Sequence, residues 1–589
     1  MNKKLLVTSN IKSIFGNNQN IYLINEIDSV FHIKNELPKD IFVFKLEDRW
    51  KNRALAIKDY KYLSNLYKQI LPKISNSLNI LHNVDYSNRS WEFVIGFWLH
   101  QFLAVSFDRY HQIQEGIKKW GKLDTYVISF KGIDLTPLSF TQASAYMDDL
   151  AWNHYFYSKL FYYFKEINII KFNNNETFLP KDYWNQYKKI IEKNNFFNFK
   201  KKIKSFLNKL PGRHNTIFFS DTNLNYKQFL LLNYYTNQIP NFIEFPILEK
   251  KKTNRKMREW QIDGYFAKNK FEKVLAKIIP HFIPQTVVEN FFKYKNEVSL
   301  LNLPQKPRLI ISSTNHFFND GFKVWAQEKI NNGAKLITIQ HGGGVFNKYN
   351  TTWDYDINIS DFHLTTGKLN IKKNKTYSVG QTFNRYQKNR FNKKGKGLLI
   401  EATSNKFNTD LRSMLKPSQY IEYLSEQFQF YRSLNKDIQK QIEVRLFTID
   451  HGWETKKRWE EQFEEVTFSD IESPISILSK NMRIVISSYP VTTFNETLAA
   501  NIPTLLFFNP KHYEFLKTAN DDFLKLKQVG ILHHDPKSAA IFMNKVWDKI
   551  DIWWLSKDVQ SARSQYCENF ADIPKNQILK MSKKINSLL

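Results

Sequence analysis

Strand and helix alternate in the middle of the chain, an order that few folds accommodate. Residues 308–312 and 335–340 are apolar runs with the length of buried strands, and residues 320–330 between them have helical spacing. A strand–helix–strand unit of this length places its strands parallel, with a right-handed crossover. Ligands of such sheets bind at the carboxyl ends of the strands, so the sequence predicts a binding site just after residue 340.

The same alternation returns in the last third of the chain. It follows a polar, glycine-containing stretch at 393–397. The strands that we expect there lie at 398–401, 443–447, 484–487 and 504–507. A chain of 589 residues is also too long for one hydrophobic core.

We therefore predict an α/β fold of two Rossmann-type domains that face a central cleft. The N-terminal domain is expected to span 1–385, with a large helical insertion at about 50–210, because helical apolar spacing dominates that region. The C-terminal domain is expected to span 386–589 and to end in a helical tail.

The chain is strongly basic, with 86 Lys and Arg against 56 Asp and Glu, a formal charge of +30. Such a surplus favours anionic partners, but AT-rich coding DNA explains a lysine excess equally well. The lysines are scattered and form no basic arm, which argues against nucleic acid as a partner. One cysteine, Cys567, excludes a disulfide framework within the chain and fits a reducing cytoplasm. No apolar stretch is long enough for a membrane span.

The segment Gln340-His341-Gly342-Gly343-Gly344 follows the predicted strand at 335–340. Glycines permit close approach of the backbone, and their amides bind anions. We expect Gln340, Gly342 and Gly343 to form a phosphate or sugar loop and His341 to transfer protons. A tight turn with a structural histidine is the alternative.

A second segment, at 486–499, joins a strand that ends in hydroxyl residues to a helix. Hydroxyls and free amides at a helix amino terminus bind anions without a metal. Ser487, Ser488, Thr492 and Thr493 are therefore candidate ligands of a donor nucleotide, with Glu496 as a candidate ligand of its ribose. Capping of the helix explains the same residues without a ligand.

Three acidic residues complete the candidates. Asp320, between the strand at 308–312 and its helix, is expected to face the same cleft as His341, as base or nucleophile; helix capping is an equal alternative. Asp354-Tyr355-Asp356 matches a DxD metal signature, but we interpret these two carboxylates as solvated loop residues and assign no metal.

Ordered motifs occur along nearly the whole chain. In the N-terminal part they are Glu47-Asp48-Arg49-Trp50, Asp59-Tyr60-Lys61-Tyr62-Leu63, Leu78-Asn79 with His82, Arg89-Ser90-Trp91, Gly96-Phe97-Trp98-Leu99 and Phe107-Asp108-Arg109-Tyr110. Further along they are 318–326, 340–343, 495–504, 529–532 and Trp553-Trp554. With these motifs the chain resembles a transferase family encoded in bacterial O-antigen and surface-polysaccharide gene clusters.

The His-Gly and Ser/Thr-rich motifs are also similar to those of capsule-type Kdo transferases. This resemblance implies a GT-B fold without a metal or other cofactor, and transfer of Kdo or a related sugar from a CMP-activated donor to a lipid-linked glycan. If configuration is retained, the resemblance also implies Asp320 as the nucleophile. From the single cysteine and the basic surface we expect a cytoplasmic enzyme in peripheral contact with the anionic inner membrane. The chain departs from the family pattern at Val345-Phe346, at 364–367 and at 25–27, near the expected cleft.

Other functions stay open at this stage. Transfer of a polyol phosphate from a CDP-activated donor fits the same fold and basic character. A catalytically inactive scaffold fits the departures from the family motifs, and a nucleic-acid-binding protein fits the charge.

Overall fold

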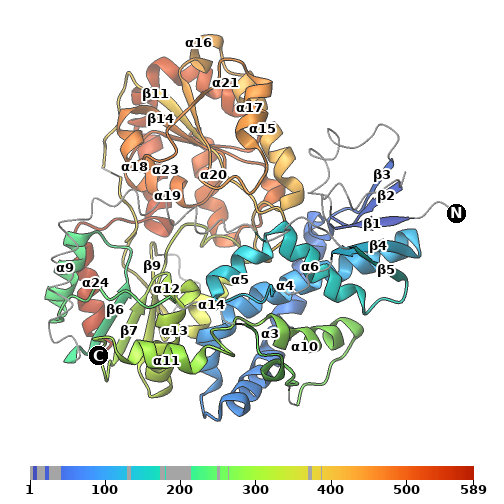
Figure 1. Cartoon of the computed structure of the whole chain (residues 1–589). Helices are drawn as coiled ribbons and strands as arrows, with labels where there is room; N and C mark the ends of the chain where they lie inside the picture. The colour runs from blue at the N-terminus through green and yellow to red at the C-terminus, as the bar shows by residue number, and fades with distance from the viewer. Residues whose placement is uncertain are drawn as a thin grey trace.

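In the computed structural model, the residues described are 4–8, 20–25, 42–128, 134–172, 180, 214–247, 252–262, 264–368, 374–386 and 388–589. Within them the strands form three sheets, in which neighbouring strands run parallel. Figure 1 shows the C-terminal sheet above the other two, with the first sheet beside the N-terminus.

The first sheet has the order β3-β2-β1-β4-β5. Its strands are β1 (Leu5–Val7), β2 (Asn20–Leu23), β3 (Phe42–Lys45), β4 (Leu123–Ile128) and β5 (Ile167–Phe172). Short apolar runs at residues 5–8 and 41–44 favour strands, and β1 and β3 lie there. β4 and β5, in contrast, lie inside the region predicted as helical. Each has only six residues, and the longer, aromatic-rich helices that precede them dominate the periodicity of that region.

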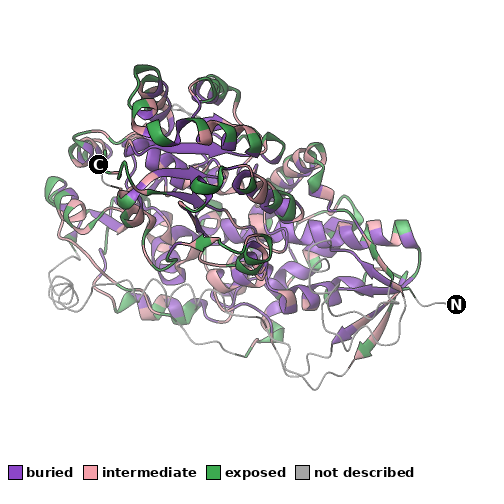
Figure 2. Cartoon of the chain, turned by 90° about the horizontal axis from the view of Figure 1, so that it is seen from above, coloured by how far each residue is buried: buried purple, intermediate pink, exposed green. Residues whose placement is uncertain are grey.

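Long helices connect the first sheet to the rest of the chain. They are α3 (Arg53–His82), α4 (Asn88–Trp120), α5 (Phe140–Met147), α6 (Leu150–Phe161), α10 (Lys270–Phe282) and α11 (Phe291–Ser299). The Asn52 side chain accepts from two amides at the start of α3, and Asn83 ends that helix in the left-handed conformation. Most residues of α4 are buried, and Figure 2 shows that buried residues fill the interior of the chain. We refer to these helices together as the helical layer.

The second sheet, β10-β9-β8-β7-β6, contains the predicted strand–helix–strand unit. Its strands are β6 (Ile217–Asp221), β7 (Leu309–Ser312), β8 (Lys335–Ile339), β9 (Phe362–Thr365) and β10 (Thr376–Ser378). Helices in this part are α9 (Tyr226–Tyr235), α12 (Asn315–Phe318), α13 (Asp320–Asn331) and α14 (Thr351–Ile359). The last helix of the chain, α24 (Gln577–Asn586), returns to pack here through Met581 and Ile585.

The third sheet has the order β13-β12-β11-β14-β15-β16, so the strand order reverses between β11 and β14. Its strands are β11 (Lys396–Ile400), β12 (Ile442–Arg445), β13 (Thr467–Phe468), β14 (Met482–Ser487), β15 (Thr504–Phe507) and β16 (Leu532–His533). The helices of this part are α15 (Tyr420–Arg432), α16 (Lys436–Gln439), α17 (Thr455–Gln462), α18 (Ile475–Leu478), α19 (Thr492–Ala499), α20 (Asn520–Gln528), α21 (Pro536–Val546), α22 (Ile550–Trp554) and α23 (Lys557–Phe570).

The second and third sheets are the two Rossmann-type units predicted from the sequence, and the α/β, GT-B-like fold class is confirmed. The first sheet is an addition that the sequence did not predict. None of the helices in the described part of the chain is both long and apolar enough to cross a membrane.

Buried polar contacts join α4 of the helical layer to the segment that follows β11 in the C-terminal part of the chain, which contains the third sheet. The guanidinium of Arg109 donates to the backbone oxygen of Asn408 at 2.8 Å and to Asp108 at 2.6 Å, with none of its side chain exposed. The amide of Asn408 donates in return to Asp48 and Asp108, each at 3.1 Å. The segment after β11 is therefore fixed against α4.

Candidate active site

A cavity of about 220 Å³ lies where the three parts of the chain meet. From the helical layer and the second sheet it is lined by Phe97, Gln101, Ser144, Ala145, Asp148, Phe317, Phe318, His341 and Thr352. From the C-terminal part it is lined by Asn405, Thr409, Asp410, Arg412, Ile449 and His451. The candidate site thus combines titratable side chains from both sides of the domain interface.

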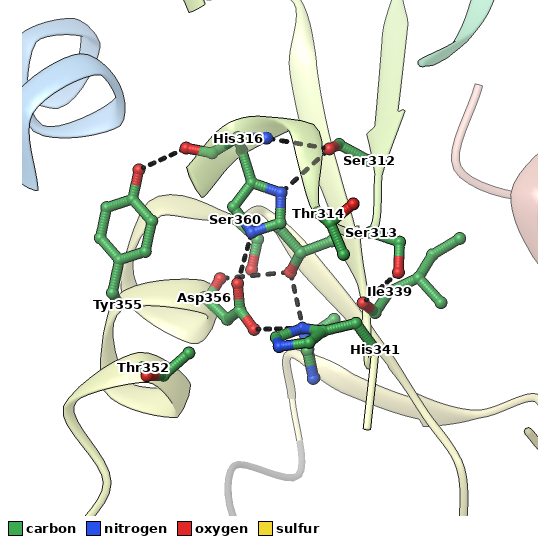
Figure 3. A network of polar contacts seen from close by, with 12 residues as sticks. Ser312, Ser313, Thr314, His316, Ile339, His341, Thr352, Tyr355, Asp356 and Ser360 are labelled. Carbon is green, nitrogen blue, oxygen red and sulfur yellow. Dashed lines mark hydrogen bonds and ion pairs between the residues drawn. The ribbon is translucent and has the colours of Figure 1, made fainter. Parts of the chain in front are cut away.

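His341 follows β8 and lies against a buried carboxylate. Its Nδ1 is 3.8 Å from Oδ2 of Asp356 on α14, and its ring stacks on Trp353 with 5.9 Å between centroids. The His341 side chain is 28% exposed, whereas Asp356 is fully buried. Because Nδ1 faces Asp356 (Figure 3), Nε2 is the nitrogen left for a reacting group in the cavity.

A polar chain continues behind Asp356. Its Oδ1 is 2.5 Å from Nε2 of His316, whose Nδ1 is 3.0 Å from the Ser312 hydroxyl. Ser312 donates to Asp221 at 2.8 Å, and Asp221 also accepts from the amides of residues 313–315. Each member is oriented by the next, so the position of Asp356 beneath His341 is fixed.

Burial favours the neutral forms of Asp356, His316 and His341. Desolvation raises the pKa of Asp356 to about 8, against a smaller lowering by His341, and lowers the pKa of His316 to about 3. Desolvation also lowers the pKa of His341, which Asp356 opposes by favouring the charged ring. A proton gained by His341 therefore favours ionisation of Asp356, and the two groups change charge together.

The interpretation of Asp354 and Asp356 as solvated loop residues was wrong. Both lie on α14, Asp356 is fully buried, and Asp354 accepts a hydrogen bond from the Tyr60 hydroxyl of α3. This helix was not predicted, because its nine residues are too few to show a clear helical period. Within the described residues, no group of three or more His, Cys, Asp or Glu side chains is arranged to hold a metal.

A second His–Asp pair also lines the cavity. Nδ1 of His451, from the loop after β12, is 2.6 Å from Oδ2 of Asp148 at the end of α5. His451 has a φ of +53°, which is uncommon for a residue with a side chain. This pair was not predicted from the sequence, although His451-Gly452 follows its strand as His341-Gly342 follows β8.

The two glycine- and hydroxyl-rich segments predicted from the sequence meet in the structure. The Gly343 amide donates to the Thr492 hydroxyl at 3.0 Å, at the amino terminus of α19. A Cβ on Gly343 would lie 2.8 Å from the backbone carbon of Val491 and 2.9 Å from the Thr492 nitrogen. Gln340 supports the loop, since it donates to the Gly342 oxygen and accepts from the Thr366 amide.

We expect Gly343→Ala to destabilise the protein by about 1–3 kcal/mol, because the new methyl group meets backbone atoms that cannot rotate away. Gly342→Ala is the matched control: its Cβ would meet only the rotatable Thr492 hydroxyl, at 3.0 Å. Urea unfolding of both variants measures the difference. Equal stability of the two would show that the loop is not tightly packed on α19.

Asp320 does not line the cavity with His341. Its carboxylate accepts from the Phe140 amide at 3.2 Å and from the Thr286 hydroxyl at 2.6 Å. It thus satisfies the first amide of α5, and burial raises its pKa to about 6. The expectation that Asp320 faces the same cleft was wrong, because its side chain turns toward α5.

The predicted donor residues lie at the carboxyl edge of the third sheet, where most of their hydroxyls have partners within the chain. Ser487 donates to the Tyr489 oxygen, and Ser488 to the Ile400 oxygen. Thr493 is buried, 3.4 Å from the Tyr489 hydroxyl. Burial raises the pKa of Glu496 to about 8, and Arg385 opposes this shift. None of these residues lines the cavity that contains His341.

Comparison with known proteins adds the following. Among solved structures, the pneumococcal O-GlcNAc transferase GtfA in complex with UDP and GlcNAc is 13% identical, with 51% of this chain and 60% of that chain covered and a TM-score of 0.31. The UDP complex of S. aureus MnaA is 9% identical, with 51% and 81% covered and a TM-score of 0.31. An O-GlcNAc transferase of Thermobaculum terrenum is 8% identical, with 91% and 98% covered and a TM-score of 0.31.

The search of curated proteins finds no match to this sequence. A family model, in contrast, matches residues 4–585, which is nearly the whole chain and includes all three sheets and the cavity between them. That model describes the LIC12162 family transferase, and the chain belongs to this family of transferases.

Proposed function

We propose that this transferase is a glycosyltransferase that moves a sugar from a nucleotide-activated donor to a hydroxyl of an acceptor. The observation that supports this most is the cavity between the domains, where His341, backed by Asp356, faces residues that follow strands of the third sheet. A donor bound at the carboxyl edge of that sheet presents its sugar to His341.

In the proposed reaction His341 acts as general base. Its Nε2 takes the proton of the acceptor hydroxyl, whose oxygen bonds to the anomeric carbon while the bond from that carbon to the phosphate oxygen breaks. Asp356 stabilises the imidazolium that forms. Arg412 also lines the cavity, where it pairs with Asp410 at 2.8 Å and its buried Nε has no hydrogen-bond partner among the described residues. In this proposal its guanidinium binds the departing phosphate.

Further groups are proposed for the donor. The α19 amino terminus, with Ser488 and Thr492, adds positive partial charge near the phosphate, and Glu496 holds the ribose. In this proposal Asp320, the first residue of α13, has a structural role, since its carboxylate accepts from the first amide of α5.

The resemblance to capsule-type Kdo transferases favours a CMP-activated 2-keto sugar as donor and a lipid-linked glycan of a surface polysaccharide as acceptor. The charge of +30 suits an enzyme that works beside an anionic inner membrane.

The test is release of nucleotide from CMP-, UDP-, GDP- and dTDP-sugars by the purified chain, with and without oligosaccharide acceptors. We expect one class of donor to be consumed, and expect His341→Ala to abolish the release. Transfer of the phosphate together with the organic group of a CDP-polyol would identify a phosphotransferase instead. Absence of turnover with all donors and acceptors would contradict the proposal.

A further inference from the structure

A second cavity, of about 630 Å³, opens beside the first at the carboxyl ends of β11, β12 and β13. It is lined by residues 401–403 after β11, 446–450 after β12, and 468, 469 and 471 at β13, with Tyr420 and the first turns of α17. Its volume is within the range of small-molecule sites. Neither motif singled out in the sequence accounts for it.

Three polar side-chain atoms at this cavity have no hydrogen-bond partner. They are Oε2 of Glu401, Oγ1 of Thr403 and Oγ of Ser469, which find no partner among the described residues. Oε2 of Glu454, also at this cavity, pairs with Lys457 at 3.7 Å. Glu401 is only 1% exposed and Ser469 only 5%. The other carboxylate oxygen of Glu401 accepts from Nε1 of Trp459 at 2.7 Å, which fixes the carboxyl group in place. Buried polar atoms are rarely left unpaired in a folded protein, so these atoms point to a ligand.

The remaining walls are apolar. Phe447 is 47% exposed and Ile471 is 41% exposed, although both line the cavity. Phe468 lies beneath the ammonium group of Lys456, which is 5.6 Å from the ring centroid. Apolar walls with a few hydrogen-bonding groups at one end suit a flat ring that carries polar atoms on its edge.

The cavity adjoins the candidate active site. Ile449 lines both cavities, so a ligand that extends past Ile449 reaches from one to the other. The Tyr423 hydroxyl lies 2.5 Å from the Ser488 hydroxyl and accepts from the amide of Ala402, next to Glu401. Glu401 directly follows the last residue of β11, where the strand order reverses between β11 and β14. Sheets of this kind bind their ligands at such a reversal.

We propose that this cavity holds the nucleobase of the donor and that Glu401, in its acid form, donates a hydrogen bond from Oε2 to an acceptor atom of the base, with Ser469 and Thr403 beside it. This inference rests on the proposed function, since it names the site that recognises the nucleobase of that donor.

The protonation of Glu401 follows from its surroundings. Burial raises its pKa to about 8, against a lowering by the Trp459 hydrogen bond. Two phenol groups face Glu401, those of Tyr420 and Tyr423. The charged residues at the mouth of the cavity are Asp450, Glu454, Lys456, Lys457 and Glu460. A raised carboxyl pKa means that the acid form persists below about pH 8 and is lost above it. Binding that needs this proton is constant below that pH and weakens by about tenfold per unit above it.

The test is calorimetric titration with CMP, UDP, GDP and dTDP, with the tightest ligand then measured between pH 7.5 and 9.5. We expect the affinity of the unaltered chain to fall by about tenfold or more over this range. Glu401→Gln keeps a donor without titrating, so its affinity should stay level with pH. Glu401→Leu has no donor and should bind at least roughly tenfold more weakly at pH 7.5.

Glu460→Gln is the matched control, because Glu460 is an exposed carboxylate at the mouth of the same cavity, paired with Lys456 at 3.7 Å. This variant should keep the pH profile of the unaltered chain. A nucleotide that binds the Glu401→Leu chain as tightly as the unaltered chain, or a Glu401→Gln chain with an unchanged pH profile, would overturn the inference and leave the proposed function standing. If none of the four nucleotides binds, the proposed function fails as well.

Discussion

Replacement of Asp356 by asparagine is expected to slow glycosyl transfer by about a hundredfold to ten-thousandfold while donor binding changes little. Asparagine has nearly the same volume, and burial already holds Asp356 neutral below about pH 8, so the fold should tolerate the change. The amide cannot ionise when His341 gains a proton, and the imidazolium then lacks its counter-charge at 3.8 Å. The measurement is kcat and KM for nucleotide release.

Asp354→Asn is the matched control for this prediction. Asp354 is on the same helix, but its carboxylate accepts from Tyr60 and does not face His341. The control should retain nearly all activity. An Asp356→Asn enzyme with normal kcat would show that His341 does not act through this carboxylate.

Arg109→Ala is expected to lower the free energy of unfolding by about 3–5 kcal/mol, the usual effect of removing one partner of a buried ion pair. Arg109 has no exposed side-chain surface, and it donates to Asp108, Asn153 and the Asn408 oxygen. Truncation leaves the Asp108 carboxylate buried without its cation. It also releases the segment around Asn408 from the helical layer, so the two sides of the active-site cavity should separate more easily.

Chemical denaturation of Arg109→Ala and of Arg89→Ala measures this effect. Arg89, also on α4, pairs with Asp361 at the surface, where the two side chains are 42% and 28% exposed. Its loss should cost no more than about 1 kcal/mol. Equal stabilities of the two variants would contradict the assigned role of Arg109 at the interface.

The sequence predicted the second and third sheets well because their strands are continuous apolar runs. The strand predicted at 504–507 is β15 (Thr504–Phe507), and β8 follows the prediction to within one residue. Buried parallel strands have this apolar pattern on both faces, and the intervening helices have a different period. Two-residue strands such as β13 and β16 are too short to carry any periodic signal.

The pairing of strands in the first sheet could not be predicted from the sequence, for a related reason. Only three residues form β1, and more than one hundred residues separate it from its neighbour β4 in the sequence. Pairing over such a distance depends on how α3 and α4 pack, which local patterns do not encode.

Within the site, the His341 loop was recognisable because a histidine and three glycines directly follow a buried strand. The partner Asp356 was not, because a lone acidic pattern is usually solvated, and only the docking of α14 buries it. His451, like His341, follows a strand and precedes a glycine, but this pattern is weaker than that of the His341 loop. Its partner Asp148 lies about 300 positions away, and only the contact between the domains brings the two together at 2.6 Å.

The most direct test of a nucleotide-dependent transferase is calorimetric titration of CMP, CDP, UDP, GDP and dTDP into two variants and the unaltered chain. Ile449→Trp places a large side chain between the two cavities, and Ile541→Trp places the same side chain on an exposed position of α21, where Ile541 is 67% exposed. We predict that one nucleotide binds the unaltered and Ile541→Trp chains alike and fails to bind Ile449→Trp; the resemblance to Kdo transferases implies that this nucleotide is CMP. Binding that survives in Ile449→Trp, or no binding by any of the chains, would contradict this prediction.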